Sequence, residues 1–206
     1  EEMRAVFALL CLAAHASFAL GMKVSLASFR KQAVRFGASA LVAAAAVAPA
    51  YAQVSLLPYV NMKYETKLSY PADWTEFQGT LSGDRSIVAF SAPTDADTSA
   101  SIVFTPVPAD YNKLNSFGGK ETIRSFLVPS GEGVSTKVIA ETVKGESYFV
   151  EYVVTAPDSP VRHVQSVFAL RPQESVIGLT IQTKEDTFAQ YKEAFAAILP
   201  TFAVKG

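Results

Sequence analysis

The order of strand-like and helix-like segments predicts an α+β fold for residues 63–206. Runs rich in Val, Ile, Tyr and Phe follow one another between turn residues, and two helical patterns stand apart from them instead of alternating with every strand. This order is typical of an antiparallel sheet with segregated helices. A chain of 206 residues, half of them hydrophobic, is long enough for one well-buried domain and short for two.

The first strand is predicted by strict alternation over residues 63–70. Tyr64 and Leu68 fall on one side of the strand, whereas Lys63 and Lys67 fall on the other, as in a half-buried strand. Pro71 breaks the pattern. Further strand-like segments follow at residues 86–90 and 101–105, separated by a polar stretch.

A short helix is predicted next, because Ile123, Phe126 and Leu127 recur at helical spacing before Pro129. Strand signals then resume with turn residues between them, which indicates a meander. Four segments carry these signals: residues 134–143, 147–155, 161–170 and 175–182.

The last helix has the clearest pattern. Thr183 and Asp186 have capping-box spacing, and four apolar side chains then share one helical face before Pro200 ends the helix. These side chains are Phe188, Tyr191, Phe195 and Ile198. Residues 201–204 are expected to return as a short final strand.

Residues 1–52 are expected to form a cleavable, multipart targeting leader. Residues 3–17 have the order of a secretory signal peptide, residues 18–35 are basic and free of carboxylates like a transit peptide, and residues 36–47 are apolar before Ala50-Tyr51-Ala52. Such a series predicts entry into a complex (secondary) plastid and then the thylakoid lumen, with a mature chain beginning at Gln53. The alternative is that residues 36–47 anchor the chain, although a bilayer span needs about 20 apolar residues.

Charge and cysteine content exclude several function classes for the remainder. Five of the 18 Lys and Arg lie in the leader, but just two of the 19 Asp and Glu do, so the rest of the chain has a net charge of −4. This balance argues against nucleic acid as a partner. The one cysteine, Cys11, lies in the leader, so no disulfide or thiolate metal site is expected downstream.

Residues 53–62 are predicted to be a flexible arm that orders on docking. They precede the first alternating strand and are almost uncharged. A short apolar segment of this kind can fill a groove on a partner. The docking side chains expected in this arm are Val54, Leu56, Leu57 and Tyr59.

Three blocks of the sequence resemble the PsbP family. They are residues 68–74, with Pro71 three residues before Trp74; residues 143–152, with a glycine turn and paired aromatics; and the stretch from Arg162-His163 to Val204. The resemblance implies an α/β/α sandwich with a central antiparallel sheet. It also implies a non-enzymatic extrinsic subunit of photosystem II that stabilises calcium and chloride at the manganese cluster.

The partners implied by the resemblance are the photosystem II core and other extrinsic lumenal subunits, with the protein peripheral to the thylakoid membrane. Two alternatives stay open. A PsbP-domain assembly factor for a photosystem would carry the same fold, and a small lumenal hydrolase would have to rest on His163, the only histidine after His15.

His163 has two interpretations. It is either a hydrogen-bonded strand histidine near a turn or, as the resemblance implies, a ligand for a weakly held divalent cation such as calcium, manganese or zinc, with no tightly bound cofactor. Asp158 and Glu174 in the flanking turns are the carboxylates that would join it. Glu141, Glu146 and Glu151 are interpreted as solvated charges at strand ends and a turn.

Overall fold

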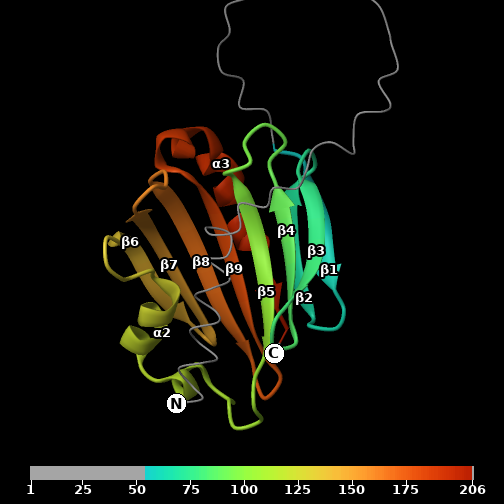
Figure 1. Ribbon diagram of the computed structural model, residues 1–206. Coiled ribbons are helices and arrows are strands. Elements are labelled where there is room, and N and C mark those ends of the chain that lie inside the picture. The colour runs from blue at the N-terminus through green and yellow to red at the C-terminus, as the bar shows by residue number, and fades with distance from the viewer. Residues whose placement is uncertain (1–53, 206) are drawn as a thin grey trace, which may run out of the picture.

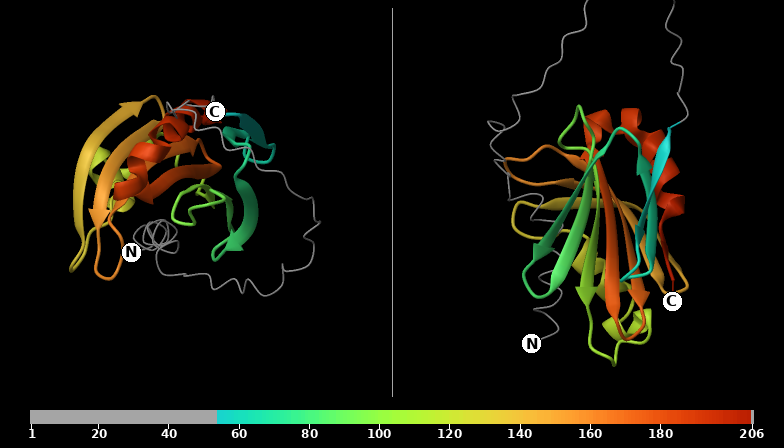
Figure 2. Two further views of the ribbon diagram at one scale, coloured as in Figure 1. Left: turned by 90° about the horizontal axis from the view of Figure 1, so that it is seen from above. Right: turned by 90° about the vertical axis from the view of Figure 1, so that its right-hand side faces the viewer.

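The computed structural model describes residues 54–205, so the predicted leader and Gln53 lie outside the described residues. A large sheet has seven strands: β3 (Thr75–Leu81), β4 (Arg85–Ser91), β5 (Ser99–Pro106), β6 (Ser135–Lys144), β7 (Ser147–Thr155), β8 (Arg162–Arg171) and β9 (Ser175–Lys184). Their order across the sheet is β3-β4-β5-β9-β8-β7-β6, and every neighbouring pair is antiparallel. The sheet is strongly curved (Figures 1 and 2).

A small antiparallel sheet and two helices cover the large sheet. The small sheet contains β1 (Leu56–Asn61), β2 (Thr66–Pro71) and β10 (Ala203–Val204), in the order β1-β2-β10. The helices are α2 (Lys120–Leu127) and α3 (Phe188–Ile198), and the short 3-10 turns are η2 (Leu114–Phe117), η3 (Glu185–Thr187) and η4 (Leu199–Thr201). Among residues 54–205, no helix has the length and apolarity needed to cross a bilayer.

Alternation along the strands separates two hydrophobic clusters, one on each face of the large sheet. On one face, Phe90, Phe104 and Leu179 pack with β1, β2 and α3, including Phe195. On the other face, Tyr148 and Phe168 pack with α2 and η2. Strand β7 shows the cause, because its residues are alternately half-buried and buried along nearly its whole length.

The predicted α+β class and the α/β/α sandwich are confirmed. A helix lies on each face of the central antiparallel sheet, and the predicted strands from residue 86 onward are all present. The predicted final strand is also present as β10.

The predicted flexible arm is wrong, because β1 pairs with β2 along its whole length, from Leu56 opposite Pro71 to Asn61 opposite Thr66. Tyr59 is 8% exposed and packs edge-on against Phe90, with ring centroids 5.5 Å apart. Strand β1 therefore packs against the core of the folded chain. The predicted first strand is accordingly the second, and it begins at Thr66 after a turn in which Glu65 has a φ of 46°.

Two further details differ from the sequence prediction. Strand β3 was not expected, since six of its seven residues are exposed and it lacks a buried face. The capping box does not form, because Thr183 lies within β9 and its Oγ1 hydrogen-bonds Thr98 Oγ1 at 2.6 Å and Thr187 Oγ1 at 2.9 Å. The chain then makes the 3-10 turn η3 before α3 begins at Phe188.

We expect Phe195→Ala to lower the free energy of unfolding by about 3 to 5 kcal/mol, as is typical for truncating a buried phenylalanine. Phe195 is 1% exposed and anchors α3 in the cluster beside the small sheet. Denaturant titration measures the change, and Gln190→Ala at an exposed position of the same helix is the control. A loss below roughly 1 kcal/mol for Phe195→Ala would mean that α3 does not bury this face.

Candidate functional site: a buried histidine between two carboxylates

His163 lies near the start of β8, is 3% exposed, and has both ring nitrogens occupied. Nε2 is 2.8 Å from Glu151 Oε1, and Nδ1 is 2.8 Å from Glu185 Oε2. Both contacts are hydrogen bonds when both ring nitrogens carry protons, because an ionised carboxylate accepts and does not donate. The predicted hydrogen-bonded strand histidine is therefore what the structure contains.

Three elements bring this cluster together. Glu151 comes from β7, where it lies opposite Gln165 and diagonal to His163. Glu185 opens η3, and its backbone N–H also donates to the Val161 carbonyl oxygen at 2.8 Å. The contact therefore joins β7 and β8 to the segment that begins α3.

Phe188 covers the histidine from the helix side. Its ring stacks on the His163 ring with centroids 3.5 Å apart and planes 5° apart, and its other neighbour is Phe195 at 6.0 Å. We call His163, Glu151, Glu185, Gln165 and Phe188 the His163 cluster. It fastens α3 to the sheet by hydrogen bonding and ring contact together.

The electrostatics of Glu151 follow from its position. Burial alone would raise the pKa of this carboxyl, but hydrogen bonds from Gln165 Nε2 (3.0 Å) and from His163 hold the pKa below its ordinary value of 4.5. Glu151 is thus kept ionised at neutral pH beside the imidazole.

The structure does not bring the predicted metal set together. Glu174 follows the far end of β8, roughly 26 Å from His163 at about 3.3 Å per residue, and it pairs there with Arg171 at 3.0 Å. Asp158 is exposed in the β7–β8 turn with a φ of 56°. Within residues 54–205, no group of three or more His, Cys, Asp or Glu side chains has an arrangement that could hold a metal ion.

The carboxylates interpreted as solvated are structural contacts. Glu151 belongs to the His163 cluster. Glu141 contacts Lys120 at 2.7 Å and accepts a hydrogen bond from Tyr148 Oη, and these contacts lower the pKa of Glu141. Burial and the Glu141 carboxylate raise the pKa of Tyr148. Glu146 accepts a hydrogen bond from the Leu114 backbone N–H, which holds η2 against the turn between β6 and β7.

One partner of His163 could have been found from the sequence, and the other could not. The predicted strand ends Thr155 and Val161 imply the register that the hairpin adopts, and this register places Glu151 diagonal to His163. Glu185 gave no such signal, because its position depends on where β9 ends and η3 begins.

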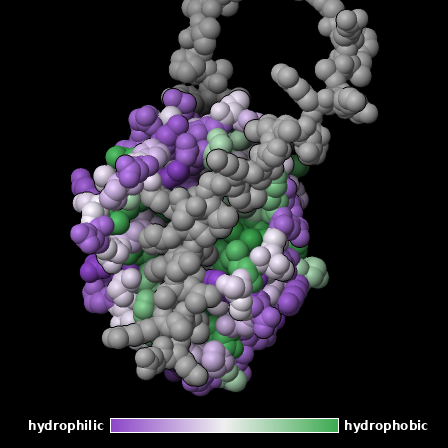
Figure 3. All heavy atoms as spheres, viewed as in Figure 1, coloured by the Kyte–Doolittle hydropathy of each residue, from purple (hydrophilic) through white to green (hydrophobic). Residues whose placement is uncertain are grey.

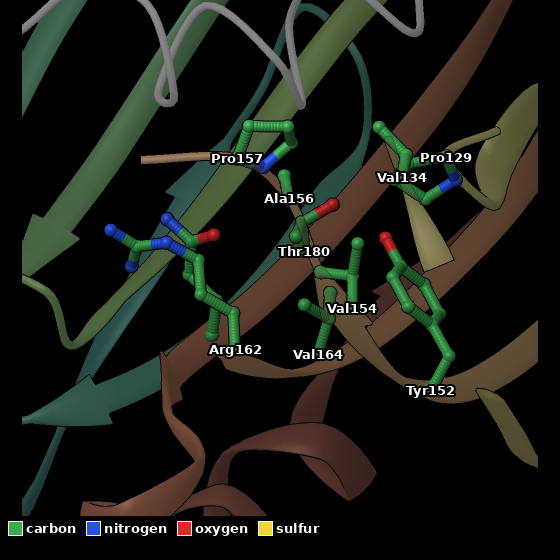
Figure 4. Close-up of a pocket in the computed structure, with 10 residues that line it drawn as sticks. Pro129, Val134, Tyr152, Val154, Ala156, Pro157, Arg162, Val164 and Thr180 are labelled. Carbon is green, nitrogen blue, oxygen red and sulfur yellow. The ribbon is translucent and has the colours of Figure 1, made fainter. Parts of the chain in front are cut away.

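A small apolar pocket of about 230 Å³ lies on the opposite face of the large sheet. Valines from β7 and β8 line its middle, and Arg162 and Tyr152 lie at its two ends (Figure 4). Apolar side chains are visible as a patch on this face, and hydrophilic ones lie around its rim (Figure 3). The pocket is smaller than the roughly 300 to 1,000 Å³ typical of small-molecule sites.

The predicted docking residues divide between core and surface. Tyr59 belongs to the core, Val54 and Leu56 are half-buried, and Leu57 is 44% exposed. Beyond the predicted set, Val60 is 51% exposed and Met62 is 83% exposed. Val60 and Met62 line the same shallow surface hollow, and alternation places them on the opposite side of the chain from Leu57 and Tyr59. We call Val60 and Met62 the β1 patch.

These features define a class of protein, an α/β/α domain built on one antiparallel sheet. The family model described as PsbP matches residues 55–204, and the chain belongs to the PsbP family. A curated relative, PsbP domain-containing protein 3, chloroplastic, of Arabidopsis thaliana, is 26% identical over 136 residues, which is 61% of this chain and 55% of the relative. The chain thus spans about half the length of that relative.

Solved structures share the fold. Cyanobacterial PsbP (CyanoP) from Synechocystis sp. PCC 6803 matches with a TM-score of 0.57 at 20% identity, over 78% of this chain and 98% of that one. LpqN of Mycobacterium tuberculosis, involved in cell envelope biogenesis, matches with a TM-score of 0.50 at 12% identity, over 74% and 91%. At these identities the likeness shows the fold alone.

We expect Glu151→Gln to lower the free energy of unfolding at neutral pH. The variant should also lose less stability than the wild type as the pH is lowered. The pKa of Glu151 is depressed in the folded chain, so its contribution is fully present above the ordinary value of 4.5 and disappears as the pH falls through the folded value. Denaturant midpoints measured from neutral pH downward give both profiles.

Glu193→Gln, at an exposed position of α3, is the matched control and should reproduce the wild-type profile. Parallel wild-type and Glu151→Gln profiles over the whole pH range would show that the carboxylate is not coupled to folding.

Proposed function

We propose that this protein is a non-enzymatic partner of photosystem II in the plastid thylakoid lumen, peripheral to the membrane. Membership of the PsbP family is the observation that carries the proposal. The chloroplastic designation of the curated relative and the leader pattern of residues 1–52 support the compartment.

Its specific role, in this proposal, is that of an extrinsic subunit. Seated beside other extrinsic subunits, it would support oxygen evolution by retaining calcium and chloride at the manganese cluster. A photosystem assembly factor is the second candidate, and it is kept because the curated relative is named a PsbP domain-containing protein and because both roles would use the same folded surface.

Binding, and not catalysis, is the proposed mode of action. His163 is the one histidine of the described chain, and a carboxylate contacts each of its ring nitrogens at 2.8 Å. A general base needs a nitrogen that can accept a proton from a nucleophile. The proposal accordingly involves no tightly bound cofactor and no hydrolytic step.

A rigid surface does the docking in this proposal, in place of the arm expected from the sequence. Strand β1 is held to β2 by a full antiparallel register, yet the β1 patch leaves two apolar side chains in solvent. Preformed apolar side chains lose little conformational freedom when they bind, which favours association with a large membrane complex.

We expect the wild-type chain to rebind to washed photosystem II membranes and to raise oxygen evolution at limiting calcium and chloride. The double variant Val60→Lys/Met62→Lys should rebind at least roughly tenfold more weakly, because two lysines would have to lose water at the interface. Its thermal stability should stay near that of the wild type, since both side chains are largely exposed.

Ile139→Lys is the matched control, as Ile139 is 50% exposed on β6, an edge strand of the large sheet, whereas β1 belongs to the small sheet. Equal rebinding by the double variant and the wild type would assign docking to another surface. A wild-type chain that neither rebinds nor restores activity would contradict the proposed subunit role itself.

A further inference from the structure

Strand β3 forms one edge of the seven-stranded sheet and lies in solvent. Among residues 54–205, its only strand neighbour is β4, and residues 75–80 are all exposed. Figures 1 and 2 show β3 at the end of the curved sheet opposite β6. The outer backbone N–H and C=O groups of an edge strand can pair with another strand.

The two edges of the sheet differ in how they are protected. Strand β6 carries Lys137 and Lys144 and has a bulge between Val138 and Ala140, which are features that discourage pairing with a further strand. Strand β3 contains no lysine and no proline, and its register with β4 is regular over seven consecutive pairs. It is the edge that remains competent to pair.

Two residues of β3 are unexplained by the packing of one chain. Phe77 exposes 56% of its surface, although it is the largest apolar side chain of the strand. Gly79 does not have a positive φ, and an added Cβ would meet only Ile87 Cγ2 at the ordinary contact distance of 3.5 Å. Glycine weakens a strand interior, so its presence here calls for a close neighbour that is not in the same chain.

We propose that β3 pairs with β3 of a second copy of this chain, antiparallel and about a two-fold axis through Gln78. This register pairs all seven residues of the strand. It places Phe77 of each copy opposite Gly79 of the other, on the face that carries Ala89 and Ile87. The ring covers the bare backbone of the glycine, a pairing known to rescue glycines in strands.

Charge and size are consistent with this self-association. Glu76, the one charged residue of β3, lies opposite Thr80 of the second copy, so like charges do not face each other directly. The two strands would make one continuous sheet across the axis, as in isologous dimers. A single strand pair is a small interface, so the dimer is a weak one that forms at tens to hundreds of micromolar chain.

Cysteine cross-linking tests both the contact and its register. The chain from Gln53 is used because both hydrophobic clusters lie within residues 59–204 and the native Cys11 is absent from it. Residues directly opposite each other have Cα atoms about 4.5 to 5.5 Å apart, within disulfide range, whichever hydrogen-bonding class the pair belongs to. Gln78→Cys should therefore form a disulfide-linked dimer on mild oxidation.

Thr80→Cys is the matched control, exposed on the same strand but displaced from the axis. In the proposed register, position 80 of one copy lies opposite position 76 of the other, so the two substituted positions are four residues, or roughly 13 Å, apart along the strands and should not cross-link. Equal cross-linking of the two variants would show random collision and would overturn the proposed register.

Sedimentation equilibrium tests the dimer without oxidation. Phe77→Lys should weaken it at least roughly tenfold, because both copies lose the aromatic contact. Thermal stability of Phe77→Lys should stay near that of the wild type, since Phe77 is 56% exposed in the single chain. A wild-type chain that stays monomeric at high micromolar concentration, or a Phe77→Lys chain that dimerises as well as the wild type, would refute the proposal.

Discussion

Aromatic contacts between the two sheets hold the described elements in place. Tyr59 and Tyr70 both pack on Phe90, with ring centroids 5.5 and 4.2 Å apart, and Tyr64 stacks on Phe104 at 4.3 Å. Each such pair contributes about 0.5 to 1.5 kcal/mol beyond the area it buries. Because Tyr59 comes from β1, this strand is part of the core, and the N-terminal segment is fixed before any partner arrives. The same layer receives α3, whose start the His163 cluster fastens to β7 and β8.

Sequence reasoning recovered the elements in which burial follows a simple period. Strands β4 to β9 show alternation or dense β-branched and aromatic composition, so their positions were predicted to within a few residues. Strands β1 and β3 were missed because Pro58 and Gly79 interrupt their patterns and because their neighbours, not their own residues, determine that they form. At the site, the hydrogen-bonded state of His163 could be predicted from alternation. The predicted strand ends also imply that Glu151 lies diagonal to His163, whereas Glu185 could not be assigned without the geometry of η3.

The molecule thus separates a rigid interior from two exposed apolar features. The His163 ring near α3 is hydrogen-bonded to two carboxylates, and the pKa shifts of Glu151 and Glu141 follow from contacts that fix helices to strands. Function is therefore carried, in our account, by the outside of the scaffold. The β1 patch lies on the small sheet and Phe77 lies on the outermost strand of the large sheet, so a membrane partner and a second copy of the chain would use different surfaces.

The central claim, that this PsbP-family protein is a photosystem II subunit, is tested most directly by its stoichiometry in isolated complexes. Mature photosystem II particles are purified under conditions that keep peripheral proteins attached, and the chain is quantified against a core polypeptide with isotope-labelled peptides. Our account predicts one copy, or one dimer, per reaction centre in the mature complex. Presence in immature complexes alone would identify an assembly factor, and absence from every form of photosystem II would contradict the account.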